Sequence, residues 1–148
     1  MINLRSTSFS HNEPIPKKHS GEGGDLSPPL TWNGGPPETK EYALICDDPD
    51  APMAEPFVHW VLYKIPASQN SLPEGSNGGG VEGQNTAGKN KYMGPMPPPG
   101  HGVHHYHFKL YALDTKLDLE PGATKHDLLK AIEGHILDEG ELIGTYER

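Results

Sequence analysis

The chain has 148 residues, a length typical of one domain, and it can bury about two thirds of its extended surface. Its formal net charge of -8 at pH 7 argues against a protein that follows a nucleic-acid backbone, because such proteins cluster lysine and arginine. Cys46 is the only cysteine, which excludes an intramolecular disulfide and fits a reducing, cytoplasmic location.

The N-terminal residues 1–6 lack the apolar run of a signal peptide, and no segment approaches the ~18 apolar residues that span a bilayer. We therefore expect no stable membrane insertion and no export by the usual route. We predict one domain over residues 1–148.

The first half of the chain predicts short strands separated by loops. Residues 1–8 predict a first strand, and residues 10–25, rich in polar residues and glycine, predict a long loop or an edge hairpin. Residues 27–33 predict a second strand that its prolines confine to an edge. Residues 41–46 predict a central strand.

An acidic turn follows this strand. Asp47, Asp48 and Asp50 lie within four residues, and three carboxylates so close repel one another unless donors or cations relieve them. Turn chemistry before proline explains only one of them. The next predicted strand, residues 59–65, alternates so that His59 lies at the entrance of an apolar row formed by Val61, Tyr63 and Ile65.

A proline and glycine loop over residues 92–103 leads into a strand with several histidines. Strict alternation from His104 places two polar side chains, His104 and Tyr106, on the face that becomes apolar further along, whereas His105 and His107 share the other face. Before this loop, residues 68–91 form a glycine-rich excursion, and loops this long in a compact domain are usually functional or disordered.

The C-terminal part predicts a connector over residues 114–122 and then one helix. The helix begins with a capping box at residues 124–127 and keeps an apolar face across Gly134, so we expect it to reach about Asp138. Residues 141–146 predict a final strand.

Three segments carry a resemblance to a known family. They are residues 48–52 followed by His59 and Trp60, residues 94–100 followed by residues 104–106, and residues 30–32 with the strand up to Cys46. In these segments the chain resembles the phosphatidylethanolamine-binding proteins, specifically their short bacterial and archaeal branch, also called Raf kinase inhibitor-like. The resemblance runs from about residue 27 to residue 146.

The resemblance implies a mainly β, two-sheet Greek-key fold with one helix near the C-terminus and no cofactor. It also implies a small anion pocket, lined by Asp48, His59, His104 and Tyr106 and rimmed by Pro52, Gly94 and Pro97. Relatives carry cis peptide bonds at positions that match Glu55-Pro56 and Ala51-Pro52. The chain departs from the family at His105, where many relatives carry arginine, and at Met96, where cysteine or glycine is common.

The leading hypothesis is a regulatory protein that binds a phosphoryl or carboxylate group on a small molecule, a lipid head group or a peptide. We predict no enzyme, because neither motif supplies a serine, cysteine or lysine nucleophile. Two alternatives stay open: inhibition of a protease or kinase through residues 68–91, and a metal-dependent enzyme that uses His59, His104, His105 and His107. A homodimer is also left open.

Overall fold

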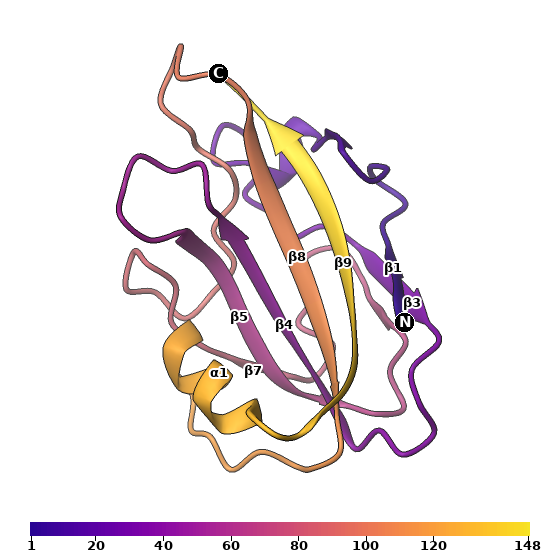
Figure 1. Cartoon of the computed structure of the whole chain (residues 1–148). Helices are drawn as coiled ribbons and strands as arrows, with labels where there is room; N and C mark the ends of the chain where they lie inside the picture. Colours follow the sequence, from indigo (N-terminus) through magenta and orange to yellow (C-terminus); the bar gives the residue numbers. More distant parts are fainter.

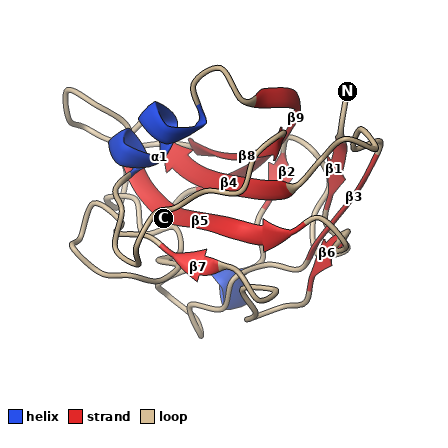
Figure 2. Ribbon diagram, turned by 90° about the horizontal axis from the view of Figure 1, so that it is seen from below, coloured by secondary structure: helices blue, strands red, loops and turns tan.

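The computed structural model describes all 148 residues. The strands are β1 (Asn3–Arg5), β2 (Glu13–Pro14), β3 (Leu30–Asn33), β4 (Glu41–Asp48), β5 (Phe57–Pro66), β6 (Ser71–Leu72), β7 (Val81–Glu82), β8 (His104–Leu113) and β9 (Ile136–Tyr146). They form a six-stranded sheet in the order β2-β9-β8-β4-β5-β7 and a three-stranded sheet in the order β1-β3-β6 (Figure 1 and Figure 2). The one α-helix is α1 (Lys125–Ile132). The mainly β, two-sheet prediction is confirmed.

Strand β4 lies at the centre because both of its faces are apolar. All of its residues are buried, and its apolar residues 42–46 alternate between two hydrophobic cores. Leu44 and Cys46 pack in the first core with residues of the three-stranded sheet, whereas Ala43 and Ile45 pack in the second core with α1. In Figure 2, α1 lies at the left of the molecule and the strands of the three-stranded sheet lie at the right. Because each face of β4 packs in its own core, the direction of every side chain on this strand is determined.

The C-terminal helix is shorter than the sequence predicted. The predicted capping box is present, but α1 ends at Ile132, and β9 already begins at Ile136. Gly134 has a φ of +80°, a conformation that ends a helix readily because glycine lacks a Cβ. The prediction of a helix to Asp138 is therefore wrong, since residues 136–140 pair with β8 instead.

The N-terminal segments also differ in detail. The first strand covers only Asn3–Arg5. Residues 10–25 form no hairpin: β2 pairs in parallel with β9, and a 3-10 helix follows at Lys17–His19.

The glycine-rich excursion covers the outer edge of β5. The strand β7 pairs with Leu62 and Tyr63, and the Gly83 N–H donates to the Val61 carbonyl at 2.7 Å. Further along, Thr86 exchanges two hydrogen bonds with Val58, one through its backbone N–H and one through its hydroxyl. The excursion is thus tied to the sheet along much of its length.

Strand β5 carries two irregularities that change the faces of its side chains. One extra residue stands opposite β4 between Tyr42 and Leu44, where Lys64 has a φ of +56°, and another stands between Cys46 and Asp47, where His59 is the extra residue. Val61 and Tyr63 consequently face the second core, whereas Ile65 and Trp60 face the first. The single apolar row predicted from His59 to Ile65 is wrong.

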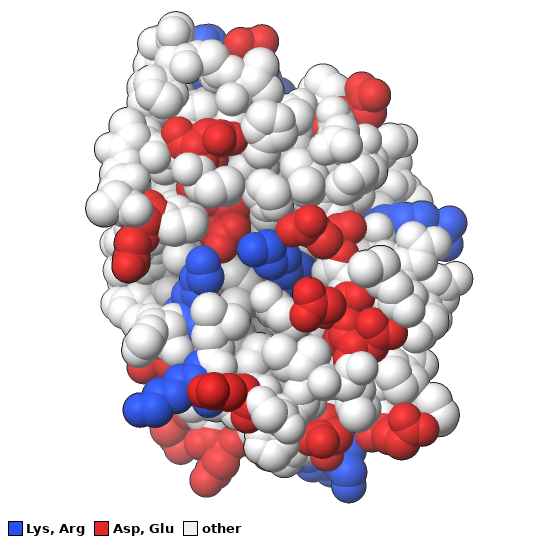
Figure 3. All heavy atoms as spheres, viewed as in Figure 1, with Lys and Arg blue, Asp and Glu red and all other residues white.

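Charged side chains are mixed over the surface. On the face seen in Figure 3, lysine and arginine side chains stand among acidic ones and form no continuous basic patch. No helix of the chain is long and apolar enough to cross a membrane.

Replacing Lys64 by glycine should stabilise the fold. The left-handed conformation at φ +56° costs a residue with a Cβ about 1 to 2 kcal/mol, and the larger backbone freedom of glycine offsets only part of that gain. We expect K64G to raise the free energy of unfolding in urea by about 0.5 kcal/mol. The control K109G, in the regular part of β8, should lower it by about 0.5 to 1 kcal/mol. A lower free energy of unfolding in both variants would contradict the left-handed conformation of Lys64 in this bulge.

Candidate functional site

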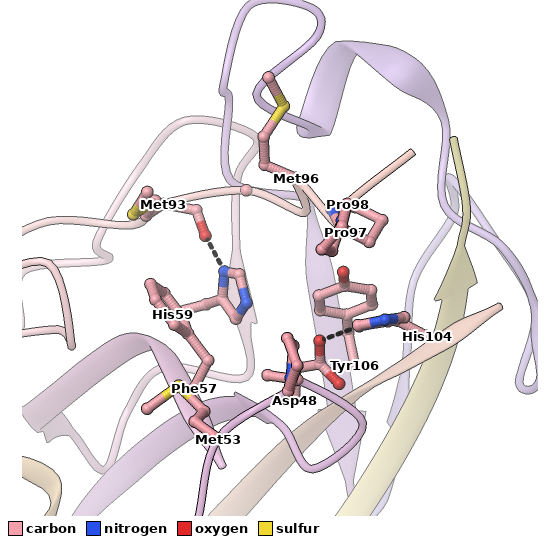
Figure 4. A pocket seen from close by; sticks show the side chains of 13 residues that line it. Asp48, Met53, Phe57, His59, Met93, Met96, Pro97, Pro98, His104 and Tyr106 are labelled. Carbon is pink, nitrogen blue, oxygen red and sulfur yellow. Dashed lines mark hydrogen bonds and ion pairs between the residues drawn. The ribbon is translucent and has the colours of Figure 1, made fainter. Parts of the chain in front are cut away.

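A cavity of about 350 Å³ lies at the end of the sheet where β4 ends and β5 and β8 begin. Antiparallel pairing of β4 with both neighbours brings these three ends together. The loops over residues 49–56 and 93–98 close the cavity from the sides (Figure 4). Its walls are formed by Asp48, Ala51, Pro52, Met53, Phe57, His59, Met93, Gly94, Met96, Pro97, Pro98, His104 and Tyr106.

The structure therefore brings together all seven residues that the resemblance placed at the site. Asp48, His59, His104 and Tyr106 are almost fully buried and form its floor. Pro52, Gly94 and Pro97 belong to the surrounding loops. The alternation predicted for β8 is confirmed, because His104 and Tyr106 lie on the face of the first core.

Asp48 and His104 form a buried pair. The Nδ1 atom of His104 lies 2.6 Å from Oδ2 of Asp48, and the side chains are only 2% and 4% exposed (Figure 4). Since a carboxylate oxygen only accepts, Nδ1 of His104 carries the hydrogen. The other carboxylate oxygen accepts the backbone N–H of Asp50 at 2.8 Å. Asp48 is thereby satisfied on both oxygens and holds the His104 ring in one orientation.

His59 reaches the cavity because it is the extra residue of the β5 bulge. In a regular strand the side chains of His59 and Trp60 would point to opposite faces. The extra residue lets both lie on the face of the first core, while Val58 packs against the second core. The Nδ1 atom of His59 donates to the Met93 carbonyl at 2.6 Å, and its ring meets the Tyr106 ring edge-on at 5.1 Å between centroids. The Nε2 atom makes no hydrogen bond within the chain.

Burial sets the protonation of two groups in the floor. It lowers the pKa of His59 below the ordinary value of 6.5, although the hydrogen bond to Met93 and the Asp48 carboxylate oppose this. Burial, and then the charge of Asp48, raise the pKa of Tyr106. At neutral pH His59 is uncharged, with its hydrogen on Nδ1, and Tyr106 keeps the hydroxyl hydrogen that can be donated to a ligand.

The rim loop is supported by residues far away in the sequence. The Gly94 N–H donates to Asp25 at 2.7 Å, and a Cβ on Gly94 would stand 2.1 Å from the His19 carbonyl. Further along, Arg148 Nε donates to the Pro97 carbonyl at 2.6 Å. Sequence reasoning missed these supports, because no local pattern links residues 69 and 51 positions apart.

The peptide bonds before Pro52 and Pro56 are both trans. The cis geometry that the resemblance implied is thus wrong for this chain. The trans form is preferred before proline by about 0.5 to 1 kcal/mol, and the turn between β4 and β5 is formed with both bonds trans. The Met53 N–H donates to the Ala51 carbonyl at 2.8 Å within this turn.

The two residues that depart from the family pattern, Met96 and His105, have different positions relative to the cavity. Met96 lines the cavity wall, where its sulfur packs close to Gly21 and 44% of the residue is exposed. His105 stays outside the cavity and binds Asp50 twice, through its backbone N–H and its ring.

The four histidines of the metal hypothesis do not converge. His105 pairs with Asp50 and His107 pairs with Glu141, both outside the cavity, whereas His59 and His104 face into it. The structure contains no group of three or more histidine, cysteine or acidic side chains arranged to hold a metal ion.

The sequence model of one family, described as phosphatidylethanolamine-binding protein, matches residues 5–147. The chain belongs to the phosphatidylethanolamine-binding protein family. A UPF0098 protein of Methanothermobacter thermautotrophicus is 48% identical over 153 residues, with 99% of each chain covered.

Two solved members of the family have closely similar structures. A phosphatidylethanolamine-binding protein homologue from Chlamydia trachomatis is 42% identical with a TM-score of 0.94, over 99% of this chain and 97% of the other. Escherichia coli YbcL, described as a member of the mammalian family, is 32% identical with a TM-score of 0.93, over 99% and 98% of the two chains. The chain thus has the fold of these two proteins.

Replacing Gly94 by alanine should damage the rim. The added Cβ would meet the His19 carbonyl at 2.1 Å and the Ser20 backbone at 2.8 Å, so the loop must shift. We expect G94A to lower the free energy of unfolding by about 1 to 3 kcal/mol in urea. The control G24A, whose Cβ would meet nothing closer than 3.6 Å, should stay within about 0.5 kcal/mol of the wild type. Equal stability of G94A and the wild type would contradict the contact.

His59 should resist protonation. Because its pKa lies below 6.5 in the folded protein, NMR of the ring nitrogens should show the neutral Nδ1–H form at pH 6.5. The unfolded chain binds this proton more tightly, so the stabilising effect is full above about pH 6.5 and is lost as pH falls through the folded pKa. The stability advantage of the wild type over H59Q should therefore shrink below pH 6.5. An Nε2–H form, or a pKa above 6.5, would contradict the assignment.

Proposed function

We propose that this protein binds a phosphoryl or carboxylate group, carried by a small molecule, a lipid head group or a peptide, in the cavity above Asp48. The observation that carries the proposal is the floor of the cavity, where two imidazoles and one phenol are buried together beside a carboxylate that is already satisfied. The Nε2 atom of His59 and the hydroxyl of Tyr106 have no hydrogen-bond partner in the chain, and buried polar groups with such unused capacity favour a polar ligand.

Because the floor is uncharged at His59, an anion should bind together with a proton that this ring takes up. Tyr106 has a hydroxyl to donate, but neutral His59 offers only a lone pair at Nε2. An anion beside His59 would raise the pKa of this ring and turn Nε2 into a charged donor, which is a stronger partner than a neutral one. Binding should therefore take up a proton.

The walls of the cavity favour an apolar group next to the anion. All three internal methionines, Met53, Met93 and Met96, line the cavity together with Phe57. Methionine adapts to different shapes, so such walls suit several ligands that share one anionic group. This composition supports a binding protein, for which we propose a regulatory role.

We assign binding rather than catalysis because the site has no clear nucleophile. Cys46 is buried in the first core, where burial raises its pKa and keeps the thiol protonated.

Inhibition of a protease remains the second candidate. A carboxypeptidase Y inhibitor, solved in complex with its proteinase, shares the fold with 16% identity and a TM-score of 0.58 over 99% of this chain and 82% of the other. In the present chain residues 83–86 are tied to β5, so an inhibitory loop would have to lie elsewhere in the excursion. Incubation with a panel of serine proteases tests this candidate.

A cytoplasmic location also stays a prediction. One relative from Mycobacterium tuberculosis, 39% identical over 99% of this chain, is named as a lipoprotein. Fractionation of the native host followed by immunodetection would decide whether this chain is cytoplasmic or associated with a membrane.

Anion binding should strengthen as pH falls. We expect sulfate, whose charge is constant between pH 6 and pH 8, to bind more tightly at pH 6, because the complex holds one more proton than the free protein. Inorganic phosphate should bind at the same site. Calorimetry in buffers of different ionisation enthalpy would measure the proton uptake, and tighter binding at pH 8 would contradict the mechanism.

Variants of the floor test the site in the same assay. H104A should weaken phosphate binding roughly tenfold or more, and Y106F, which keeps the ring, should weaken it about three- to tenfold. The matched control is H135A, which removes an exposed imidazole near the opposite end of β8. Unchanged binding in both floor variants would refute the proposed function.

A further inference from the structure

A third histidine contacts the floor of the cavity from outside. The Nδ1 atom of His101 lies 2.6 Å from Nε2 of His104, and the two ring centroids are 4.8 Å apart at an interplanar angle of 60°. His101 is exposed, whereas His104 is almost fully buried. The pair therefore joins a surface side chain to the centre of the site.

This contact occupies the last free atom of the His104 ring. A neutral imidazole has one donor and one acceptor nitrogen, and Nδ1 of His104 already donates to Asp48. Nε2 is the only other ring atom able to form a hydrogen bond, and His101 takes it. In this state His104 has no hydrogen-bonding atom left for a ligand, in contrast to His59.

The His101 side chain is free to leave. It stands between Gly100 and Gly102, which have φ values of +75° and +101°, and no heavy atom lies within 4 Å of the position of a Cβ on either glycine. The backbone before it is anchored, since the Gly100 N–H donates to the Arg148 carbonyl at 3.0 Å. Because His101 is exposed and its neighbours are uncrowded, rotation about its side-chain bonds would take the ring into solvent while the loop stays attached.

We infer that His101 is an internal competitor of the ligand: in the free protein it donates to the His104 Nε2 atom, and it gives up this atom to a protonated oxygen of the phosphoryl or carboxyl group that binds. This inference rests on the proposed function of the cavity. The apparent affinity is reduced because only the fraction of molecules with His101 displaced can use His104. His101 then sets the affinity of the site without being part of its wall.

The variant H101A tests the competition with inorganic phosphate as the probe. A net hydrogen bond of about 1 kcal/mol corresponds to roughly a fivefold change in affinity, so H101A should bind phosphate roughly fivefold more tightly than the wild type. The control H135A, which also removes one exposed imidazole, should bind like the wild type. In the wild type, saturation with phosphate should shift the His101 ring nitrogen signals to those of a solvated imidazole.

The outcomes separate the two claims. If the wild type binds phosphate and H101A binds it equally or more weakly, His101 is not a competitor, but the anion pocket stands. If neither protein binds phosphate or sulfate, the proposed function fails and the competition fails with it. Binding by H101A in the absence of measurable binding by the wild type would support the competition.

Discussion

The site depends on one buried carboxylate. Asp48 ends β4 on the face of the first core, where an unpaired charge would be costly, and its two oxygens are satisfied by the His104 ring and by the backbone of the following turn. These two bonds connect β8 to the loop that closes one side of the cavity. The geometry of the floor therefore follows from satisfying a single charge at the end of the central strand.

The rest of the cavity is assembled from distant segments. The loop that carries Gly94 is hydrogen-bonded to Asp25 and packs closely against the His19 backbone, and the Tyr92 hydroxyl donates to the His19 carbonyl at 2.6 Å. His19 is itself fully buried, with its ring bound to the Leu26 carbonyl. The N-terminal loop, which has little regular structure, thus acts as a brace for the site.

The sequence predicted the residues of the site better than the path that brings them together. Period-two alternation was sufficient for β8, because this strand is regular, but it failed for β5, where two extra residues exchange the faces. Nothing local marks His59 as a bulge, since the bulge arises from its pairing with β4. The helix was overextended for a related reason: the apolar residues after Gly134 fit a helical period, yet they gain more by pairing with β8.

The excursion along β5 has a consequence for how this chain meets other chains. A sheet edge with free N–H and C=O groups is a template for aggregation, and natural proteins protect such edges. Here β7 and residues 83–86 occupy the edge of β5, while the two-residue strand β2 lies on β9 at the opposite edge. A segment whose composition suggests a flexible loop therefore limits the strand addition that leads to amyloid-like stacking.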